Sequence, residues 1–341
     1  MVIVMKPGCQ DSEISEVSKA LESLGLGVHI SRGMERTIIG VIGDKRLLND
    51  IPIELMPGVE KTVPIVESYK LASKTFKPEP SIIDVKGVKI GGKELVIMAG
   101  PCAIESREQI FEAAMAVKKS GAQFLRGGAF KPRTSPYAFQ GLEEEGLKLL
   151  KEAKEAAGLL AISEVTSERA VEIADLYVDM FQIGARNVQN FQLLREVGRS
   201  MKPVLLKRGP STTIDEWLNA AEYIMNEGNY NVVLCERGIR TFETATRNTL
   251  DISAVPVIKN SSHLPIIVDP SHAAGKSQYI LSLSKAAIAA GSDGLIIEVH
   301  PNPRCALSDA AQQITPGDFD ILCRDISRIA EIVGREFTHG G

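Results

Sequence analysis

Six basic residues stand at or shortly after apolar runs in this sequence: Arg126, Lys131, Arg133, Arg186, Lys207 and Arg237. If the fold brings them together, their charges repel one another unless an anion lies among them. Arginine offers a planar fork that suits phosphate and carboxylate, and lysine adds a compact charge. The group therefore predicts a ligand with more than one anionic group, although we expect one or two of the cations to pair with acids such as Glu164 or Glu236.

A second group of residues combines the donor atoms that bind divalent metals. Cys102 offers a thiol and His272 an imidazole, and two carboxylates, Glu298 and Asp309, complete the group. A lone cysteine or histidine is usually structural, but the four together form a candidate metal site. Thiolate and imidazole favour Fe, Co or Zn and two carboxylates suit Mn, so the choice of metal stays open. His300, which shares its strand face with Glu298, is left unassigned.

The apolar runs from residue 94 onwards predict the elements that position these side chains. Eight strand candidates recur: ELVIMAG, QFLRGG, LLAISEV, MFQIG, PVLLKRG, VVLCERG, LPIIVDP and GLIIEVH. Helix-like stretches separate most of them, which indicates a parallel sheet covered on both faces. Eight such units in about 250 residues predict a (β/α)8 TIM barrel of the α/β class. A doubly wound open sheet is the weaker alternative, because no GxGxxG follows the first strand.

The barrel prediction brings both groups of side chains to one end of the fold. The active site of a TIM barrel lies at the carboxyl ends of its strands, where these residues fall. Cys102, His272 and Glu298 follow the first, seventh and eighth strands, which are neighbours only if the sheet closes. Anionic groups beside a divalent metal indicate a reaction that joins or cleaves a phosphorylated substrate at a carbonyl group, with the metal as a Lewis acid.

Residues 1–66 predict a separate small domain. The strand-like runs VIVMK, GVHIS, RTIIGVIG and VEKTVPIV alternate with helical spacing over residues 11–24 and a short polar segment near residues 44–50. This order of strand, helix, two strands, short helix and strand is that of a ferredoxin-like α+β domain. Residues 67–81 are polar and contain prolines, as in a linker, and residues 82–341 are expected to form the barrel domain.

Composition narrows the class of protein. The chain has 39 basic and 43 acidic residues, a balance that argues against a broad basic face for nucleic acid. Five scattered cysteines without a CxxC pair are typical of a reducing cytoplasm. No apolar run approaches the roughly 18 residues that span a bilayer, and the start MVIVMKPGCQ is unlike a signal peptide. We therefore expect a cytoplasmic protein with no nucleic-acid or membrane partner.

The motifs GGAFKPRTSPYAFQG, IGARN, LLKRG, CERG, VDPSH and EVHP follow one another in this order. With them the chain closely resembles the 3-deoxy-D-arabino-heptulosonate-7-phosphate (DAHP) synthase family, from about residue 82 to the C-terminal helix. The resemblance is to the short subfamily with a ferredoxin-like N-terminal domain. That family consists of transferases that condense phosphoenolpyruvate (PEP) with erythrose 4-phosphate and water, releasing phosphate. The reaction is the first step of the shikimate pathway to aromatic amino acids.

The resemblance implies a role for each group of residues. It implies that PEP is bound by Arg126, Lys131, Ala185, Arg186, Lys207 and Arg237, with the phosphate at the last three and the carboxylate near the first two. Erythrose 4-phosphate would face the segment formed by Lys131, Arg133, Thr134 and Ser135. The metal ligands of the family match Cys102, His272, Glu298 and Asp309 one for one, and the catalytic set would be Lys131, Glu164 and His272.

The implied mechanism joins the PEP methylene carbon to an aldehyde that the metal polarises. Water then adds at C2 of PEP and phosphate leaves. Glu164 matches a position that could orient this water.

The motifs can be compared with those expected for three alternative functions. The sister enzyme, 3-deoxy-D-manno-octulosonate-8-phosphate synthase, uses arabinose 5-phosphate and carries Lys-Ala-Asn-Arg-Ser where this chain has Lys-Pro-Arg-Thr-Ser. A non-catalytic amino-acid sensor would be expected to lack a metal ligand or the Lys-Pro-Arg-Thr segment. A class II aldolase normally builds its metal site on several histidines, and this chain has only five. Cys102 favours metal dependence, because metal-independent relatives have asparagine in its place.

The N-terminal domain of this subfamily is similar to ACT-type regulators. Such domains bind an aromatic amino acid between subunits, which implies tyrosine or phenylalanine as an inhibitor and a homo-oligomer, with a tetramer expected from the family. His29 and Ser31, in GVHISRG, are the candidate regulatory residues. An ordinary role in an edge strand is an equally good interpretation of both residues.

Overall fold

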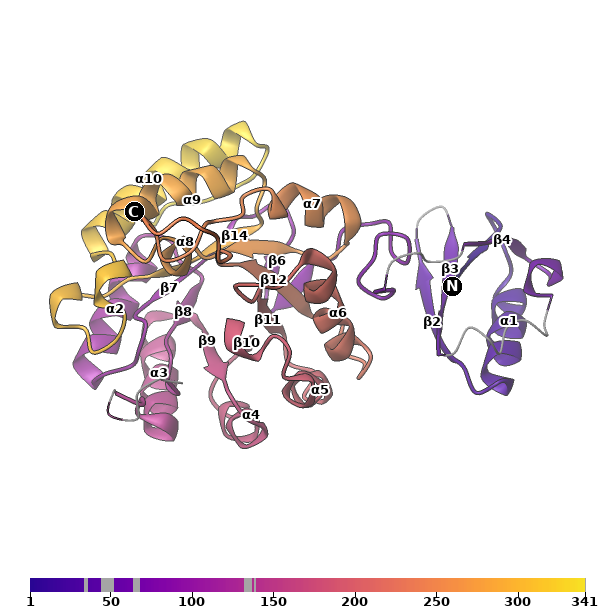
Figure 1. The fold of residues 1–341 in the computed structure, drawn as a ribbon, viewed down its shortest axis with the longest axis horizontal. Helices are drawn as coiled ribbons and strands as arrows, with labels where there is room; N and C mark the ends of the chain where they lie inside the picture. The colour runs from indigo at the N-terminus through magenta and orange to yellow at the C-terminus, as the bar shows by residue number, and fades with distance from the viewer. Residues whose placement is uncertain (34–35, 44–51, 64–67, 132–136, 138, 341) are drawn as a thin grey trace. The chain divides into compact units, whose positions relative to one another are not determined.

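The computed structural model describes residues 1–33, 36–43, 52–63, 68–131, 137 and 139–340. The chain divides into two compact units. The first contains Met1–Pro80 and Asn260–His263, and the second contains Ser81–Lys259 and Leu264–Gly341. Figure 1 shows a small sheet with its helix in the first unit and a ring of strands and helices in the second.

Eight parallel strands of the second unit close into a barrel, in the order β10-β11-β12-β13-β14-β7-β8-β9. The strands are β7 (Val96–Gly100), β8 (Phe124–Arg126), β9 (Leu160–Val165), β10 (Met180–Ile183), β11 (Val204–Lys207), β12 (Val232–Glu236), β13 (Ile266–Val268) and β14 (Gly294–Glu298). Closure depends on the pairing of β14 with β7, in which Glu298 lies opposite Gly100. The predicted TIM barrel is confirmed.

The helices surround this barrel (Figure 1): α2 (Arg107–Lys119), α3 (Glu143–Ala157), α4 (Glu168–Ala174), α5 (Phe191–Arg199), α6 (Ile214–Met225), α7 (Ala254–Ser261), α8 (Pro270–Ala274), α9 (Ile280–Ala289) and α10 (Pro316–Ile332). Several begin at a serine or threonine that accepts a hydrogen bond from the first turn, as Ser106 and Thr213 do. Such caps each contribute about 1 kcal/mol. In the segment after CERG, which the sequence left without an assigned helix, only α7 forms.

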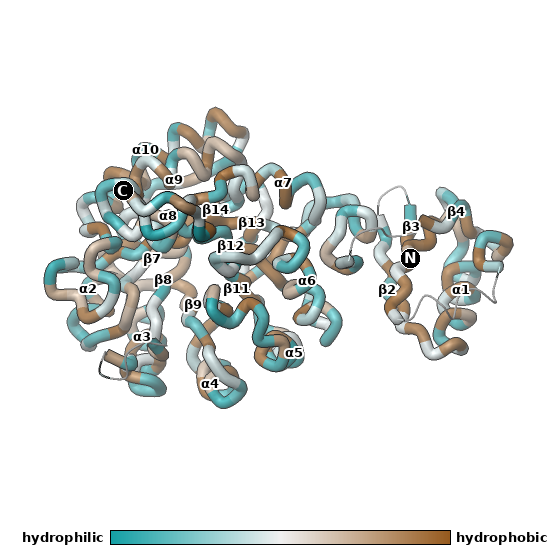
Figure 2. The backbone as a smooth tube through the Cα atoms, in the orientation of Figure 1, coloured by the Kyte–Doolittle hydropathy of each residue, from teal (hydrophilic) through white to brown (hydrophobic). Residues whose placement is uncertain are grey.

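The interior of the barrel is filled by side chains that alternate along each strand. Val96, Met98, Phe124 and Ile162 belong to one buried cluster with the interior residues of the other strands. A hairpin of β5 (Ile83–Val85) and β6 (Val88–Ile90) adds three more side chains to this cluster. Figure 2 shows the hydrophobic colours along much of the barrel strands. The amino-terminal end of the barrel is therefore closed by packing, and its open end is the carboxyl end.

The first unit has the predicted ferredoxin-like order. Its sheet runs β2-β3-β1-β4 with antiparallel neighbours, from β1 (Val2–Met5), β2 (Gly27–Arg32), β3 (Thr37–Ile42) and β4 (Val59–Val63). Helix α1 (Asp11–Ser23) packs its apolar side, including Ile14, Val17 and Leu21, on one face of this sheet. The short helix expected near residues 44–50 lies outside the described residues. A 3-10 turn, η2 (Ile53–Leu55), precedes β4.

The opposite face of the small sheet carries the two candidate regulatory residues. His29 lies opposite Gly40, and Ser31 lies opposite Ile38, in the β2–β3 register. Phe76 covers this face, because its ring centroid lies 4.5 Å from that of His29 and a Cβ on Gly40 would lie 2.1 Å from its Cε2. Residues 68–80, within the stretch expected as a linker, thus belong to the first unit and contain buried side chains such as Phe76.

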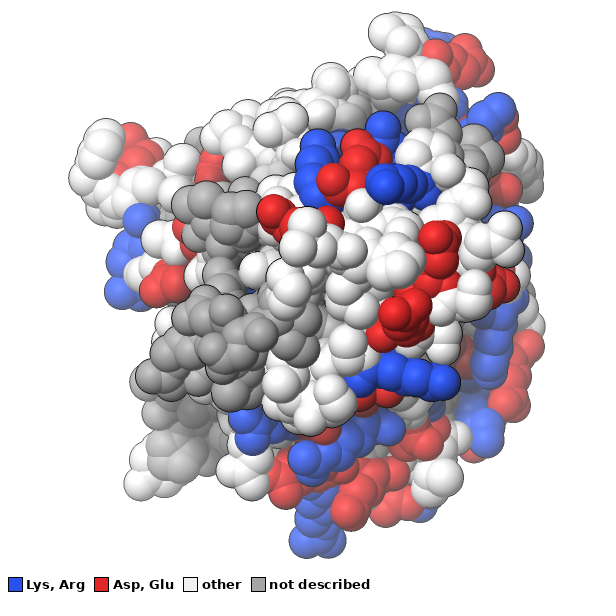
Figure 3. Space-filling view, turned by 90° about the vertical axis from the view of Figure 1, so that its right-hand side faces the viewer, with Lys and Arg blue, Asp and Glu red and all other residues white. Residues whose placement is uncertain are grey.

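Two surface properties complete the description. On the face drawn in Figure 3, lysine and arginine side chains are interspersed with aspartate and glutamate among the described residues. Among those residues, no helix is long and apolar enough to cross a membrane.

We expect Phe124→Ala to destabilise the barrel by about 3–5 kcal/mol, because Phe124 is fully buried inside it and its removal leaves a cavity. The chain has one tryptophan, Trp217, which is buried in α6. Its emission during guanidinium unfolding therefore reports the barrel unit. Met115→Ala, on the exposed side of α2, is the matched control and should change the free energy of unfolding by about 0.5 kcal/mol or less. Equal midpoints for the two variants would contradict the assigned core.

Candidate active site

A polar layer lies above the apolar core at the carboxyl ends of the barrel strands. Successive side chains of a strand alternate between its two faces, so the residue two positions after an interior residue also faces inward. Counting in this way from the buried cluster gives a polar side chain on seven strands: Arg126, Glu164, Gln182, Lys207, Arg237, Asp269 and Glu298. The change from apolar to polar along each strand therefore gathers titratable groups at one end of the barrel.

A cavity of about 300 Å³ opens at this end, and cations dominate its lining. Seven basic side chains line it: Arg126, Lys131, Arg186, Lys207, Arg237, Arg240 and Arg247. The only acidic residues among its described lining are Glu164 and Asp309. The structure thus brings together five of the six predicted cations. Arg133, together with Thr134 and Ser135, lies outside the described residues.

Two of these cations, Arg240 and Arg247, were missed by the sequence analysis. They follow β12 in a segment where no regular element was assigned. The signal that was available is their closeness in sequence to the CERG motif, since loops after barrel strands line the active site. Arg247 lies 3.5 Å from Oδ2 of Asp309 and donates to Oε1 of Gln312 at 2.8 Å.

Glu164 reaches the cavity from β9 because its neighbour on β10 leaves room for it. A Cβ on Gly184 would lie 1.9 Å from Oε1 of Glu164, so only glycine fits there without displacing the carboxylate. Gln182 donates from Nε2 to Oε2 of Glu164 at 3.3 Å. A 3-10 turn, η3 (Ala185–Asn187), begins after Gly184 and brings Ala185 and Arg186 to the cavity wall.

Three of the four predicted metal donors converge beside this cavity. One ligand atom each from Cys102, Glu298 and Asp309 lies within 4.8 Å of the others. Sγ of Cys102 lies 3.6 Å from Oδ2 of Asp309, and Nζ of Lys131 donates to the sulfur at 3.0 Å. Asp309 has a left-handed backbone, with φ of 50°. Such strain in a residue other than glycine is concentrated at functional sites.

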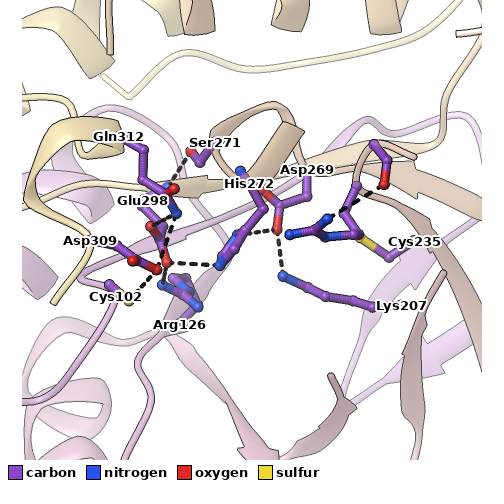
Figure 4. A network of polar contacts seen from close by, with 12 residues as sticks. Cys102, Arg126, Lys207, Cys235, Asp269, Ser271, His272, Glu298, Asp309 and Gln312 are labelled. Carbon is purple, nitrogen blue, oxygen red and sulfur yellow. Dashed lines mark hydrogen bonds and ion pairs between the residues drawn. The ribbon is translucent and has the colours of Figure 1, made fainter. Parts of the chain in front are cut away.

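His272 lies next to this group and is oriented from its other side (Figure 4). Its Nδ1 lies 2.7 Å from Oδ2 of Asp269, the residue that caps α8, and its Nε2 lies 3.5 Å from Oε1 of Glu298. Asp269 also pairs with Lys207. A carboxylate that accepts a hydrogen bond from Nδ1–H fixes the tautomer in which Nε2 has a free lone pair for a metal ion. Metal-binding histidines usually have such a partner at the other ring nitrogen.

Burial and charge together set the protonation of these donors. Burial holds the pKa of His272 below its ordinary value, which keeps the ring neutral. Burial alone would raise the pKa of Glu298, but the positive charges beside it at low pH, on protonated His272 and on Arg126, outweigh burial and bring the pKa to about 2. Burial, aided by Glu298, raises the pKa of the Cys102 thiol to about 11. A neutral imidazole and an ionised carboxylate are already suited to a cation, whereas the thiol must release a proton.

Gln312 is a second residue that the sequence analysis missed. It is buried, and its Nε2 donates to Oε2 of Glu298 at 2.6 Å and lies 3.5 Å from Oδ2 of Asp309. Arg126 donates to the other oxygen of Glu298 at 2.8 Å. Both carboxylates are therefore oriented by donors of this chain. Nothing in the residue type distinguishes Gln312 from the adjacent Gln313, which binds the backbone N–H of Cys102 instead.

His300, left unassigned above, supports the loop after β14. Its Nδ1 accepts a hydrogen bond from the backbone N–H of Asn302 at 2.9 Å, and its Nε2 lies 3.4 Å from Glu105. Glu105 in turn accepts from the backbone N–H of Leu307 at 2.9 Å. His300 thus anchors the segment that leads to Asp309.

Two protein-family models account for nearly the whole chain. The DAHP synthetase I family matches residues 72–331, and the DAHP synthase ferredoxin-like domain matches residues 1–67. The chain is 50% identical to phospho-2-dehydro-3-deoxyheptonate aldolase of Thermotoga maritima, over 98% of this chain and 99% of that relative. It is 31% identical to 2-dehydro-3-deoxyphosphooctonate aldolase of Geobacter sp. strain M21, over 74% of this chain and 98% of the relative.

The crystal structure of the Thermotoga maritima DAHP synthase superposes with a TM-score of 0.79 at 49% identity, covering 99% of both chains. Both units, and the polar groups at the carboxyl end of the barrel, thus fall within matched regions. Because the family model matches residues 72–331, which are most of the chain, this protein belongs to the DAHP synthetase I family.

Proposed function

We propose that this chain condenses PEP with erythrose 4-phosphate and water to give DAHP and phosphate, through the residues that line the barrel cavity. It is a DAHP synthase, an enzyme at the entry to aromatic amino-acid biosynthesis. The observation that carries the residue assignment is the cavity itself, which seven cations line and beside which a thiol, an imidazole and two carboxylates lie close together. A substrate pair with two phosphates and one carboxylate supplies the anions that these cations require.

PEP lies, in this proposal, across the cation-lined floor of the cavity. Arg186, Lys207 and Arg237 bind its phosphate, since they line the cavity at or shortly after the carboxyl ends of three neighbouring strands, β10, β11 and β12. Arg126 and Lys131 bind the carboxylate, and both also contact the metal donors, through Glu298 and Cys102 respectively. The methylene carbon of PEP is thereby held next to the place where the aldehyde arrives.

Erythrose 4-phosphate is assigned to the outer part of the cavity. Arg133, Thr134 and Ser135 are proposed to bind its phosphate on the basis of the sequence motif. Arg240 and Arg247 add positive charge among the described lining residues.

A divalent ion, held by Cys102, His272, Glu298 and Asp309, would polarise the aldehyde carbonyl as a Lewis acid. The donor set fits such an ion, because Nδ1 of His272 is bound by Asp269 and the carboxylate of Glu298 is ionised. The mixed sulfur, nitrogen and oxygen donors are compatible with Mn, Fe, Co or Zn.

The remaining steps are assigned to side chains of the cavity wall. We assign to Glu164 the orientation of the water that adds at C2 of PEP, because its carboxylate faces the cavity and can accept a hydrogen bond from water. Lys131 is positioned to donate a proton from Nζ to an oxygen of the reacting aldehyde. Lys207 and Arg237 neutralise the departing phosphate.

The N-terminal unit is assigned to regulation. We propose that residues 1–66 form the regulatory domain and residues 82–341 the catalytic domain. Residues 67–81 would connect them along the chain, although residues 68–80 pack as part of the first unit. An aromatic amino acid, tyrosine or phenylalanine, would bind at the sheet face that carries His29 and Ser31, and assembly as a homotetramer is proposed with it. The match of residues 1–67 to the DAHP synthase ferredoxin-like domain supports the assignment of this unit to regulation.

The sugar specificity is tested by the loss of the ultraviolet absorbance of PEP. Purified protein with Mn²⁺ should consume PEP with erythrose 4-phosphate, and arabinose 5-phosphate should be used at least about 10-fold less efficiently, as expected when a site is built for one substrate. Preference for the pentose would instead identify the activity of the octulosonate relatives. No consumption with either sugar, in metal-loaded protein, would remove the catalytic proposal.

The metal assignment predicts a spectroscopic difference between two cysteine variants. Adding Co²⁺ to EDTA-treated protein should give a thiolate-to-cobalt band in the near ultraviolet, and Cys102→Ser should abolish it. The affinity of Cys102→Ser for Co²⁺ should fall by more than the roughly 10–100-fold that the loss of a residue supporting a metal ligand costs. Cys305→Ser is the control, because Cys305 is exposed and lies outside the donor group. A band retained in Cys102→Ser and lost in Cys305→Ser would reverse the assignment.

The regulatory assignment predicts that His29→Ala and Ser31→Ala relieve inhibition while leaving uninhibited activity intact. Loss of a hydrogen bond to a bound effector costs about 1–3 kcal/mol, or about 5–150-fold in inhibitor concentration. Initial rates at increasing concentrations of tyrosine or phenylalanine give the inhibitor concentration that halves the activity of each variant. Arg32→Ala, from the other face of the same strand, is the matched control. Inhibition as strong in both variants as in the control would place the effector elsewhere.

A further inference from the structure

A buried cluster of charges lies on the outer side of the barrel, behind two of the cavity cations. NH1 of Arg208 donates to Oε2 of Glu236 at 2.9 Å and to Oδ2 of Asp251 at 2.7 Å. The side chains of Arg208 and Glu236 are 7% and 0% exposed. Nε of Arg208 also donates to the backbone carbonyl of Thr212 at 2.9 Å, and its guanidinium lies 5.8 Å from the ring centroid of Trp217. The sequence indicates Glu236 as a partner of one of the six predicted cations, but Glu236 binds Arg208 instead. It assigns no role to Arg208 or Asp251.

The cluster connects the ends of two neighbouring strands that carry phosphate-binding residues. Lys207 and Arg208 are consecutive, as are Glu236 and Arg237, so in each pair one side chain faces the cavity and the other faces away. The strands β11 and β12 pair in parallel with Lys207 opposite Cys235, and the backbone N–H of Arg208 extends this pairing to the carbonyl of Cys235 at 3.0 Å. The ion pair outside the barrel thus bridges the points from which Lys207 and Arg237 extend.

Glu236 also fixes the backbone on the far side of Arg237. Its Oε1 accepts a hydrogen bond from the backbone N–H of Gly238 at 2.6 Å, while Oε2 binds Arg208. Its own carbonyl accepts from the backbone N–H of Asp269 at 2.7 Å. Arg237 therefore projects into the cavity from between two residues whose positions are held by one carboxylate.

A gain in stability is a poor explanation for this cluster. Removing two charges from water costs free energy, and the attraction within a buried ion pair often does no more than offset this cost. Apolar replacements of similar volume are commonly neutral or stabilising. What a buried, forked pair supplies well is a fixed geometry, because the guanidinium binds its two carboxylates in set directions. Phosphate recognition requires such a geometry, since binding groups must be held within about 0.5 Å of their productive positions.

We propose that Arg208 and Glu236 are positioning residues, which set the separation and direction of Lys207 and Arg237 so that both bind the phosphate of PEP. Asp251 supports the pair as the second carboxylate on Arg208. The inference rests on the proposed function, in which Lys207 and Arg237 bind that phosphate. It assigns no contact with substrate to Arg208 or Glu236, and it predicts an effect on PEP alone.

The test compares Arg208→Lys and Glu236→Gln with the unaltered enzyme. Lysine keeps the charge but cannot bind both carboxylates and the Thr212 carbonyl at once, and glutamine keeps the shape but removes the charge. Displacement of Lys207 or Arg237 should raise KM for PEP by about 10–100-fold. The inhibition constant of inorganic phosphate, a competitor for the same cations, should rise in parallel. KM for erythrose 4-phosphate should change by less than about threefold, because the segment assigned to its phosphate, Arg133 to Ser135, is remote from the cluster in the sequence.

Asp179→Asn is the matched control for a structural effect. Asp179 is 2% exposed and lies just before β10 begins. It forms an ion pair with the largely buried Lys154 at 2.7 Å and a second with the exposed Lys86 at 2.6 Å. Its loss should lower the unfolding temperature, followed by Trp217 emission, and leave KM for PEP unchanged. Asp251→Asn removes the charge of the more exposed carboxylate on Arg208, and it serves as the test if the other variants do not fold. It should raise KM for PEP in the same direction but to a smaller extent.

Lys207→Met separates this inference from the proposed function. If Lys207→Met leaves KM for PEP unchanged, the phosphate is not bound there and the proposed function fails. If Lys207→Met raises KM while folded Arg208→Lys, Glu236→Gln and Asp251→Asn do not, only the positioning role is wrong. Equal rises in KM for both substrates, or an equal rise in Asp179→Asn, would also overturn it.

Discussion

The gathering of positive charge at the carboxyl end of a closed barrel governs how the other polar groups of this protein are arranged. Cations that share a cavity repel one another, and the repulsion is strong where burial lowers the local dielectric. Carboxylates offset this repulsion from positions below the cavity floor or on the outer side of the barrel wall. Glu298 binds Arg126, Asp269 binds Lys207, and Glu236 fixes the backbone on either side of Arg237. Each cation is thereby held in place while the cavity keeps an excess of positive charge for anionic ligands.

The same carboxylates link the anion-binding side chains to the candidate metal donors. Asp269 contacts both Lys207 and His272, and Glu298 contacts both Arg126 and His272. Lys131 reaches the sulfur of Cys102. The two groups of residues that the sequence separated by chemical type are therefore one polar network in space (Figure 4). A ligand that changes the charge at one end of this network affects the protonation and binding of groups at the other end, because buried charges in direct contact are weakly screened.

Much of this arrangement was predictable, for a definite physical reason. A parallel barrel fixes both the direction of its strands and the face on which each residue lies, so apolar runs that end in charged residues locate a site. Cys102, His272 and Glu298 were found in this way, and their strands are neighbours as predicted. Arg247 and Gln312 were not found, because they lie in irregular segments whose path follows no repeating pattern.

The period of the strands, the order of the units and the chemical types that meet at the barrel mouth could be predicted from the amino-acid sequence, because they depend on local alternation and on connection rules. The pairing of charges depends on the folded chain. Arg208 and Lys207 are adjacent cations, yet one binds Glu236 outside the wall and the other binds Asp269 within it. Partners 28 and 62 residues away decide that difference, and no local pattern specifies them.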